Sequence, residues 1–143
     1  MDKFEQLFAE YPFTLTDELV KKNTADILAK HTAENNTREV WMQCLHQIDL
    51  TTLNGDDTTE KVATMAEKVN DFDGHFPGVP NVAAMCVYPA LVETAREILT
   101  EPIGIAAVAA GFPASQTFIE VKVAEAAMAV AAGATEIDIV ISI

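Results

Sequence analysis

The chain of 143 residues carries 22 acidic and nine basic side chains, a formal net charge of −13, and half of its residues are hydrophobic. This balance is typical of a folded globular protein. The charge argues against proteins that hold nucleic acid or an anionic membrane through clustered lysine and arginine. No apolar run reaches the length of a membrane span, and the first residues lack the layout of a secretory signal. We therefore expect an acidic, cytoplasmic protein with neither nucleic acid nor a membrane as partner.

Residues 1–43 predict an N-terminal helical extension. Thr16 precedes a segment with apolar residues at helical spacing and is placed to cap a helix that ends near residue 36. Thr37 is placed to cap a second, shorter helix through Trp41. A different pattern begins at residue 44, so we expect a second unit over residues 44–143.

In this second unit the pattern predicts strands that alternate with helices. Apolar segments of strand length cover residues 44–50, 82–87, 104–111 and 136–143. Between them lie three helical segments and one loop: a helix from Thr58 to Val69, a loop over 70–80, a helix from Pro89 to Leu99, and an alanine-rich helix over 114–132 with Gly133 as its C-cap. This order favours an α/β fold with four parallel strands covered by helices. Such a sheet seldom ends on a bare strand, so we expect the fold to be truncated.

Two of the predicted strands carry an aspartate. In the last strand the isoleucines 137, 139, 141 and 143 share the face that we expect to pack against helices, and Asp138 lies on the other face. Asp49 lies in the first strand, again among positions that we expect to be buried. A buried carboxylate needs a partner or a function. Either each aspartate is a hydrogen-bonded structural group, or the two belong to a polar site at the carboxyl end of the sheet.

Five segments then occur in order and at suitable intervals: DLTTLN at 49–54, VAAMCVYP at 82–89, GFP at 111–113, EVK at 120–122 and GATEIDIVI at 133–141. Together they resemble the amino-terminal half of the 2-deoxyribose-5-phosphate aldolase family, over residues 44–143. The resemblance implies half of a (β/α)₈ TIM barrel, with strands one to four, preceded by N-terminal helices.

The resemblance also implies an activity. The family consists of class I aldolases, lyases of deoxyribonucleotide catabolism that need neither metal nor cofactor. They cleave 2-deoxy-D-ribose 5-phosphate to D-glyceraldehyde 3-phosphate and acetaldehyde, through a Schiff base on a lysine of the sixth strand that a lysine of the seventh strand assists. Residue by residue, Asp138 matches the aspartate of proton transfer, and Asp49, Thr51 and Cys86 match residues of the substrate pocket. In the alternative interpretation, Asp138 only holds a neighbouring lysine or backbone group.

The sequence departs from the family in one large respect, because strands five to eight and both active lysines lie outside it. Its lysines all fall on predicted helices, where we expect them to be solvated: Lys3, Lys21, Lys22, Lys30, Lys61, Lys68 and Lys122. We therefore expect this chain by itself to be inactive, and its open strand edges to make a homodimer or a higher assembly. The alternative function is that of a non-catalytic half-barrel, which assembles or binds a ligand.

The remaining candidates for chemistry predict no metal site. Cys44 and Cys86 lie on separate predicted strands and are expected to be reduced core thiols. His31, His46 and His75 have no metal-ligand spacing, and His46 falls in the first predicted strand.

Overall fold

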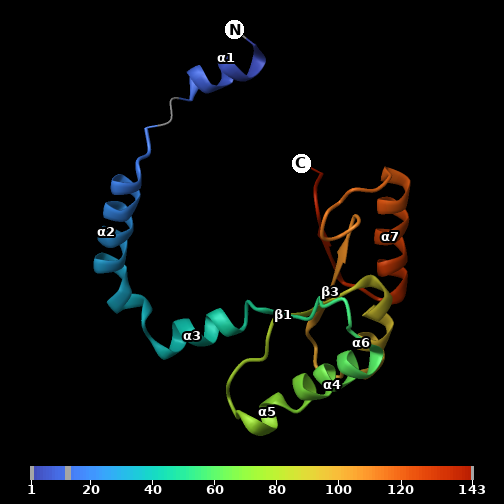
Figure 1. The fold of residues 1–143 in the computed structure, drawn as a ribbon. Helices are drawn as coiled ribbons and strands as arrows, with labels where there is room; N and C mark the ends of the chain where they lie inside the picture. The colour runs from blue at the N-terminus through green and yellow to red at the C-terminus, as the bar shows by residue number, and fades with distance from the viewer. Residues whose placement is uncertain (1, 12–13, 143) are drawn as a thin grey trace. The chain divides into compact units, whose positions relative to one another are not determined.

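The computed structural model describes residues 2–11 and 14–142. They divide into two units, Met1–Val40 and Trp41–Ile143, and Figure 1 traces the elements of each along the chain. Among the described residues, no helix is both long enough and apolar enough to cross a membrane. The boundary that we expect between residues 43 and 44 stays a prediction.

The N-terminal helices begin where polar side chains cap them. Helix α1 (Lys3–Glu10) has Asp2 as its N-cap, and helix α2 (Asp17–Asn35) has Thr16, whose hydroxyl accepts a hydrogen bond from the Leu19 amide at 3.3 Å. The Thr37 hydroxyl accepts a similar bond, also of 3.3 Å, from the amide of Val40 at the start of helix α3. Both caps predicted from the sequence, Thr16 and Thr37, are thus confirmed.

The first strand is shorter than we expected, because a helix occupies most of its predicted range. Helix α3 (Arg38–Leu45) continues through Leu45, and strand β1 covers only Asp49–Thr51. Leu45 packs against the hydrophobic core of the second unit, and this contact favours the continued helix over an extended chain. Two predictions are wrong as a result: Cys44 is exposed on a helix, and His46 lies in a turn.

The second unit is built on a four-stranded parallel sheet, as the sequence predicts. The strands are β1, β2 (Ala84–Val87), β3 (Gly104–Ala109) and β4 (Glu136–Ile139), and they lie side by side in chain order. The connections hold the helices α4 (Thr59–Asn70), α5 (Phe72–His75), α6 (Val92–Ile98) and α7 (Ile119–Ala132), and a 3₁₀ helix η1 (Pro89–Leu91). The single turn α5 falls in the segment predicted as a loop, where the Phe72 and Phe76 rings lie 5.1 Å apart.

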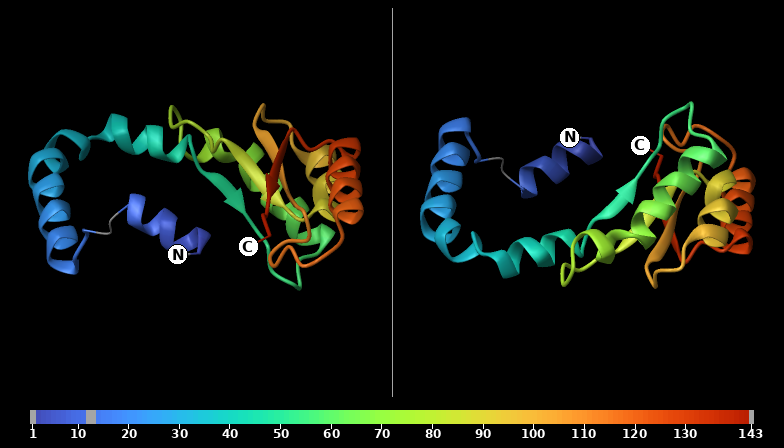
Figure 2. Two further views of the ribbon diagram at one scale, coloured as in Figure 1. Left: turned by 90° about the horizontal axis from the view of Figure 1, so that it is seen from above. Right: turned by 90° about the horizontal axis from the view of Figure 1, so that it is seen from below.

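Helices α4, α6 and α7 cover one face of this sheet, as Figure 2 shows. The main core lies between them and contains buried residues of all three helices and of the two central strands: Val62, Ala66, Val69, Val92, Ala95, Ala129, Met85, Val87, Ile105 and Ala107. A smaller cluster, which we call the inner cluster, lies on the opposite face and consists of Ala84, Cys86, Ala106 and Val108. The fold therefore presents a helix-covered face and a second face, the inner face, for chemistry.

The isoleucine face of the last strand is only partly covered. Ile137 packs against the main core, as expected, whereas Ile139 and Ile141 are 61% and 75% exposed, which contradicts our prediction. Among the described residues β4 pairs with β3 alone, so side chains farther along it have neighbours on one side only. Ile143, the last of the four isoleucines, lies outside the described residues.

The alanine-rich helix α7 begins at Ile119, five residues later than predicted. Residues 112–118 form a loop instead, and Ser115 within it has a positive φ of 58°, which is incompatible with a right-handed helix. The end is confirmed: Gly133 is the C-cap with φ 113°, in the left-handed region. This φ favours glycine, and a Cβ would also require the Arg96 side chain to move, because it would lie 2.2 Å from Cδ of Arg96.

Candidate functional site

All four candidate residues lie on the inner face of the sheet. In the register of the strands, Thr51 of β1 is opposite Cys86 of β2, while Asp49 lies two residues before Thr51 on the same face. Across β3, Asp138 of β4 is opposite Val108, which belongs to the inner cluster with Cys86. Residues far apart in the sequence are therefore brought to one surface. Thr51, Cys86 and Asp138 lie towards the carboxyl ends of their strands, where α/β proteins bind their ligands, whereas Asp49 is the first residue of β1.

The two aspartates of this surface are exposed, which corrects the expectation that they lie among buried positions. Asp49 and Asp138 belong to β1 and β4, the outer strands of the sheet, and each outer strand has a neighbour on one side only among the described residues. The buried inner-face positions belong to the central strands β2 and β3. Hydrated carboxylates need no buried partner, so both aspartates are open to a ligand.

Cys86 is buried between these carboxylates. Burial raises the pKa of its thiol above the ordinary value, a hydrogen bond with Thr51 acts in the opposite direction, and the negative charges of Asp138, Asp49 and Glu136 raise the pKa further. Since only the thiolate is a strong nucleophile, the thiol form of Cys86 lines the surface without reacting readily.

Glu136 is a third carboxylate of the inner face, and it was not among the sequence candidates. It lies opposite Ala106 and two residues before Asp138, and its carboxyl group occupies the space over Gly104. A Cβ on Gly104 would lie 2.3 Å from Oε1 of Glu136, which is closer than any normal contact. The signal in the sequence was the spacing Glu136-x-Asp138, because residues two apart in a strand share a face.

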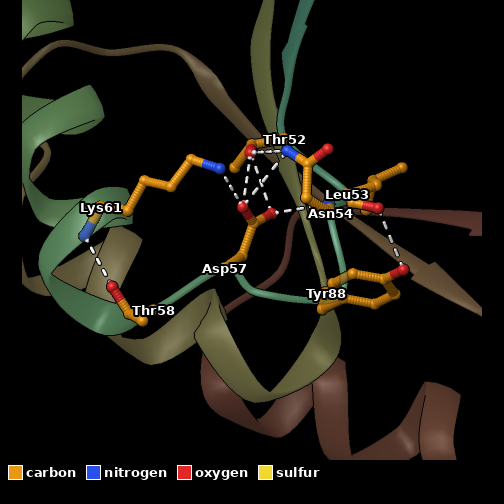
Figure 3. A network of polar contacts seen from close by, with 7 residues as sticks. All are labelled: Thr52, Leu53, Asn54, Asp57, Thr58, Lys61 and Tyr88. Atoms are coloured by element: carbon orange, nitrogen blue, oxygen red, sulfur yellow. Dashed lines mark hydrogen bonds and ion pairs between the residues drawn. The ribbon is translucent and has the colours of Figure 1, made fainter.

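A second unpredicted residue, Asp57, organises the loop that follows β1 (Figure 3). Its carboxylate accepts hydrogen bonds from the Thr52 hydroxyl at 2.9 Å and from the Asn54 amide at 3.0 Å, and it forms an ion pair with Lys61 of α4. The Lys61 ammonium lowers the pKa of Asp57 to about 2, and the bonds from Thr52 and Asn54 support this shift, which burial opposes. Asp57 is therefore ionised in the folded protein at neutral pH.

The loop that follows β1 touches the residue after β2. The Tyr88 hydroxyl donates a hydrogen bond of 3.2 Å to the carbonyl oxygen of Leu53 (Figure 3). The Tyr88 ring also meets the edge of Phe112, with the ring centroids 6.1 Å apart. Leu53, Tyr88 and Phe112 all pack against the inner cluster. Three loops at the carboxyl end of the sheet are thus joined where they pack against the inner cluster.

Two of the lysines are not simply solvated, contrary to our expectation. Besides the ion pair of Lys61, the ammonium of Lys122 donates hydrogen bonds to the hydroxyls of Ser115 at 2.6 Å and Ser142 at 2.7 Å. The Ser115 hydroxyl in turn donates to the carbonyl oxygen of Val140, so Lys122 and Ser115 tie α7 to the chain just after β4. All seven lysines nevertheless lie on helices, as predicted.

The histidines and cysteines form no metal site in the part of the chain that the structure describes, where no group of three or more potential ligands was found. His46 Nδ1 lies 2.8 Å from the carbonyl oxygen of Asn81, and His31 pairs with Glu34. Both imidazoles therefore have local partners that account for them.

Comparison with known proteins identifies the family of this chain. The family model of the DeoC/LacD family aldolases matches residues 44–143. The chain belongs to the DeoC/LacD aldolase family. The match contains all four strands and all four sequence candidates, Asp49, Thr51, Cys86 and Asp138, whose individual roles stay predictions.

The curated relatives of this DeoC/LacD member are considerably longer than the chain. The human deoxyribose-phosphate aldolase is 37% identical over 136 residues, which cover 86% of this chain and 42% of the human protein. The bovine deoxyribose-phosphate aldolase is 35% identical over the same shares of the two chains. The chain therefore spans less than half the length of these relatives.

Solved structures of aldolases share the fold of this DeoC/LacD member. The structure of QR15, an aldolase, superposes with a TM-score of 0.59 at 28% sequence identity, over 68% of this chain and 40% of that chain. The deoxyribose phosphate aldolase from Aeropyrum pernix, a tetramer, gives a TM-score of 0.55 at 24% identity, over 68% and 38%; this second likeness concerns the fold alone. The predicted fold class, part of an aldolase barrel with four parallel strands, is confirmed.

Proposed function

We propose that this chain supplies the first four strands of a deoxyribose-phosphate aldolase. The complete enzyme would cleave 2-deoxy-D-ribose 5-phosphate to D-glyceraldehyde 3-phosphate and acetaldehyde through a Schiff base, in the cytoplasm and within deoxyribonucleotide catabolism. One observation carries the proposal: in a chain of the DeoC/LacD family, Asp49, Thr51, Cys86 and Asp138 share the inner face of the sheet. Its substrate is a small phosphorylated sugar, and it uses neither metal nor cofactor.

In this proposal Asp138 transfers protons. A carbinolamine on the way to a Schiff base must lose a hydroxyl group as water, and a carboxylate beside it can deliver and recover the proton. Asp138 suits this task because it is exposed on the inner face, close to the carboxyl end of β4. Asp49 and Thr51 would contact the substrate from β1, and Cys86 would form the apolar floor between the strands.

The chain by itself is proposed to be inactive, because none of its lysines lies on a strand. We expect no covalent adduct when the 143-residue chain is incubated with 2-deoxyribose 5-phosphate or acetaldehyde and reduced with borohydride, as read by intact mass. The human aldolase serves as the positive control.

An adduct on any of the seven lysines would contradict this prediction. Lys122 is the residue to examine first, since its ammonium lies near the chain after β4. A Lys122→Met variant that loses such an adduct would identify it as the nucleophile and overturn the proposed inactivity.

The second candidate function is an assembling half-barrel without catalysis, and the outer strands favour it. In the described structure β1 and β4 each have one neighbouring strand, and Ile139 on β4 is exposed. Free strand edges pair readily with other chains. We propose that the 143-residue chain forms a homodimer or a higher assembly through these edges.

Light scattering on the purified chain tests this assembly. We expect at least twice the chain mass at micromolar concentration, and a shift towards the monomer for Ile139→Lys, which places a charge at the β4 edge. The control is Thr64→Lys, which adds the same charge to an exposed position of α4. A well-folded parent chain that scatters as a monomer would rule the assembly out.

A further inference from the structure

The side chain of Asp57 is buried, which is unusual for a carboxylate in a surface loop. Its side chain is 1% exposed, although it comes from the loop between β1 and α4. The hydrogen-bond and ion-pair partners of its carboxylate lie in that loop and in the first turn of α4: Thr52, Asn54 and Lys61. A carboxylate withdrawn from water and bound to three neighbours fixes their positions, because each lost bond would leave a buried charge unsatisfied.

The segment that Asp57 holds is the one that reaches the inner face. Thr52 and Asn54 flank Leu53, whose side chain packs on the inner cluster and whose carbonyl oxygen accepts the Tyr88 hydroxyl bond. Tyr88 then contacts Phe112. Thr52 also follows Thr51 directly, and its amide donates to the carbonyl oxygen of Cys86 at 3.1 Å.

From this arrangement we propose that Asp57 is a positioning residue, which holds Leu53 and Tyr88 as a closed cover over Cys86 and keeps Thr51 in place. This role rests on the proposed function and adds to it, because Asp57 would determine the shape of the candidate substrate pocket. The side chain of Asp57 forms its hydrogen bonds with Thr52 and Asn54, and through these two residues it acts on Leu53 and Thr51.

The first test measures the opening of this cover as the reactivity of Cys86. In a Cys44→Ala background only Cys86 remains to be alkylated. At neutral pH we expect Asp57→Asn to raise the alkylation rate about tenfold, which corresponds to ~1.4 kcal/mol of lost closure. The amide of Asn54, which donates to Asp57, should exchange its hydrogen faster in the same variant.

The matched control is Asp56→Asn, one residue away. It removes the same charge, and Asp56 acts on Lys61 through its charge alone. We expect this variant to react within about twofold of the parent. An Asp57→Asn variant that keeps its circular dichroism and reacts no faster than Asp56→Asn would overturn the proposal.

A second test keeps Asp57 in place and changes its ionisation. The charged neighbours are Lys61 and, acting on Lys61, Asp56. Lys61→Met removes the main cause of the low pKa of Asp57, so the pKa should rise from about 2 towards its ordinary value of 3.8. Lys61→Arg keeps the positive charge and should preserve the low value.

The sign of the effect follows from this shift. A depressed pKa stabilises the closed loop above the ordinary value, and the stabilisation is lost as the pH falls through the folded value. Between pH 6 and 3 the protection of the Asn54 amide, corrected for intrinsic exchange, should fall below about pH 4 in the parent and in Lys61→Arg, and should change much less in Lys61→Met, where the pKa of Asp57 is nearly the same in the open and the closed loop. Identical profiles in all three proteins would refute the role even if Asp57→Asn does not fold. Neither test measures aldolase turnover, so a failure of the proposed function leaves these results unaffected.

Discussion

The Asp138→Asn substitution is expected to lower aldolase turnover by about 10²–10⁴-fold, the usual contribution of a positioned general acid or base. The measurement uses a chimera in which the chain is joined to the part of the human aldolase that lies beyond the region matched here. Asparagine keeps the size of the side chain and cannot accept or deliver a proton. The loss should therefore appear in kcat, with KM nearly unchanged.

The control for this prediction is Glu136→Gln. Glu136 lies on the same face and carries the same charge two residues earlier, but its carboxyl group extends over Gly104. If Asp138 acts by proton transfer, Glu136→Gln should retain most of the turnover. A kcat of Asp138→Asn within about threefold of the parent chimera would leave Asp138 with the structural role that the sequence also allowed.

The Met85→Ala substitution is expected to lower the free energy of unfolding of the chain by about 2–5 kcal/mol, because it removes a buried side chain and leaves a cavity. Met85 is fully buried on the helix-facing side of β2, opposite Leu50 of β1 and Ile105 of β3. It thus lies where the central strands meet the helices. Urea unfolding, followed by circular dichroism, measures the change.

Met128→Ala is the matched control for the same chemical change. Met128 is 71% exposed on α7. Surface substitutions of this kind usually change stability by no more than ~0.5 kcal/mol. If both variants unfold at the same urea concentration, Met85 is not part of a packed core, and the arrangement of β2 against the helices is incorrect.

Helix ends were predictable because their causes are local. Thr16 and Thr37 each accept a bond from an amide three residues ahead, and Gly133 adopts a positive φ that other residues avoid. The start of α7 was not predictable in the same way. The loop before it is held by Ser115, whose hydroxyl bonds to Val140 from 25 residues away.

The predicted range of the first strand was wrong because it, too, depends on contacts with distant residues. Apolar residues over 44–50 fit a buried strand as well as the last turn of a helix. Leu45 packs against a core that is assembled from distant segments, and this contact favours the helix over the strand. Cys44 became exposed as a consequence, and its predicted burial was lost with the strand.

The sequence by itself determined the order of strands and helices, the parallel α/β architecture and the family motifs, because these follow from periodicity and from signals a few residues apart. It also determined that the acidic residues outnumber the basic ones and that no lysine falls on a strand. Only the tertiary structure decided the exposure of Cys44, Asp49 and Asp138, and the partners of Asp57 and Lys122. Solvent exposure and electrostatic environment depend on which chain segments surround a side chain, and the chain brings those segments together only when it folds.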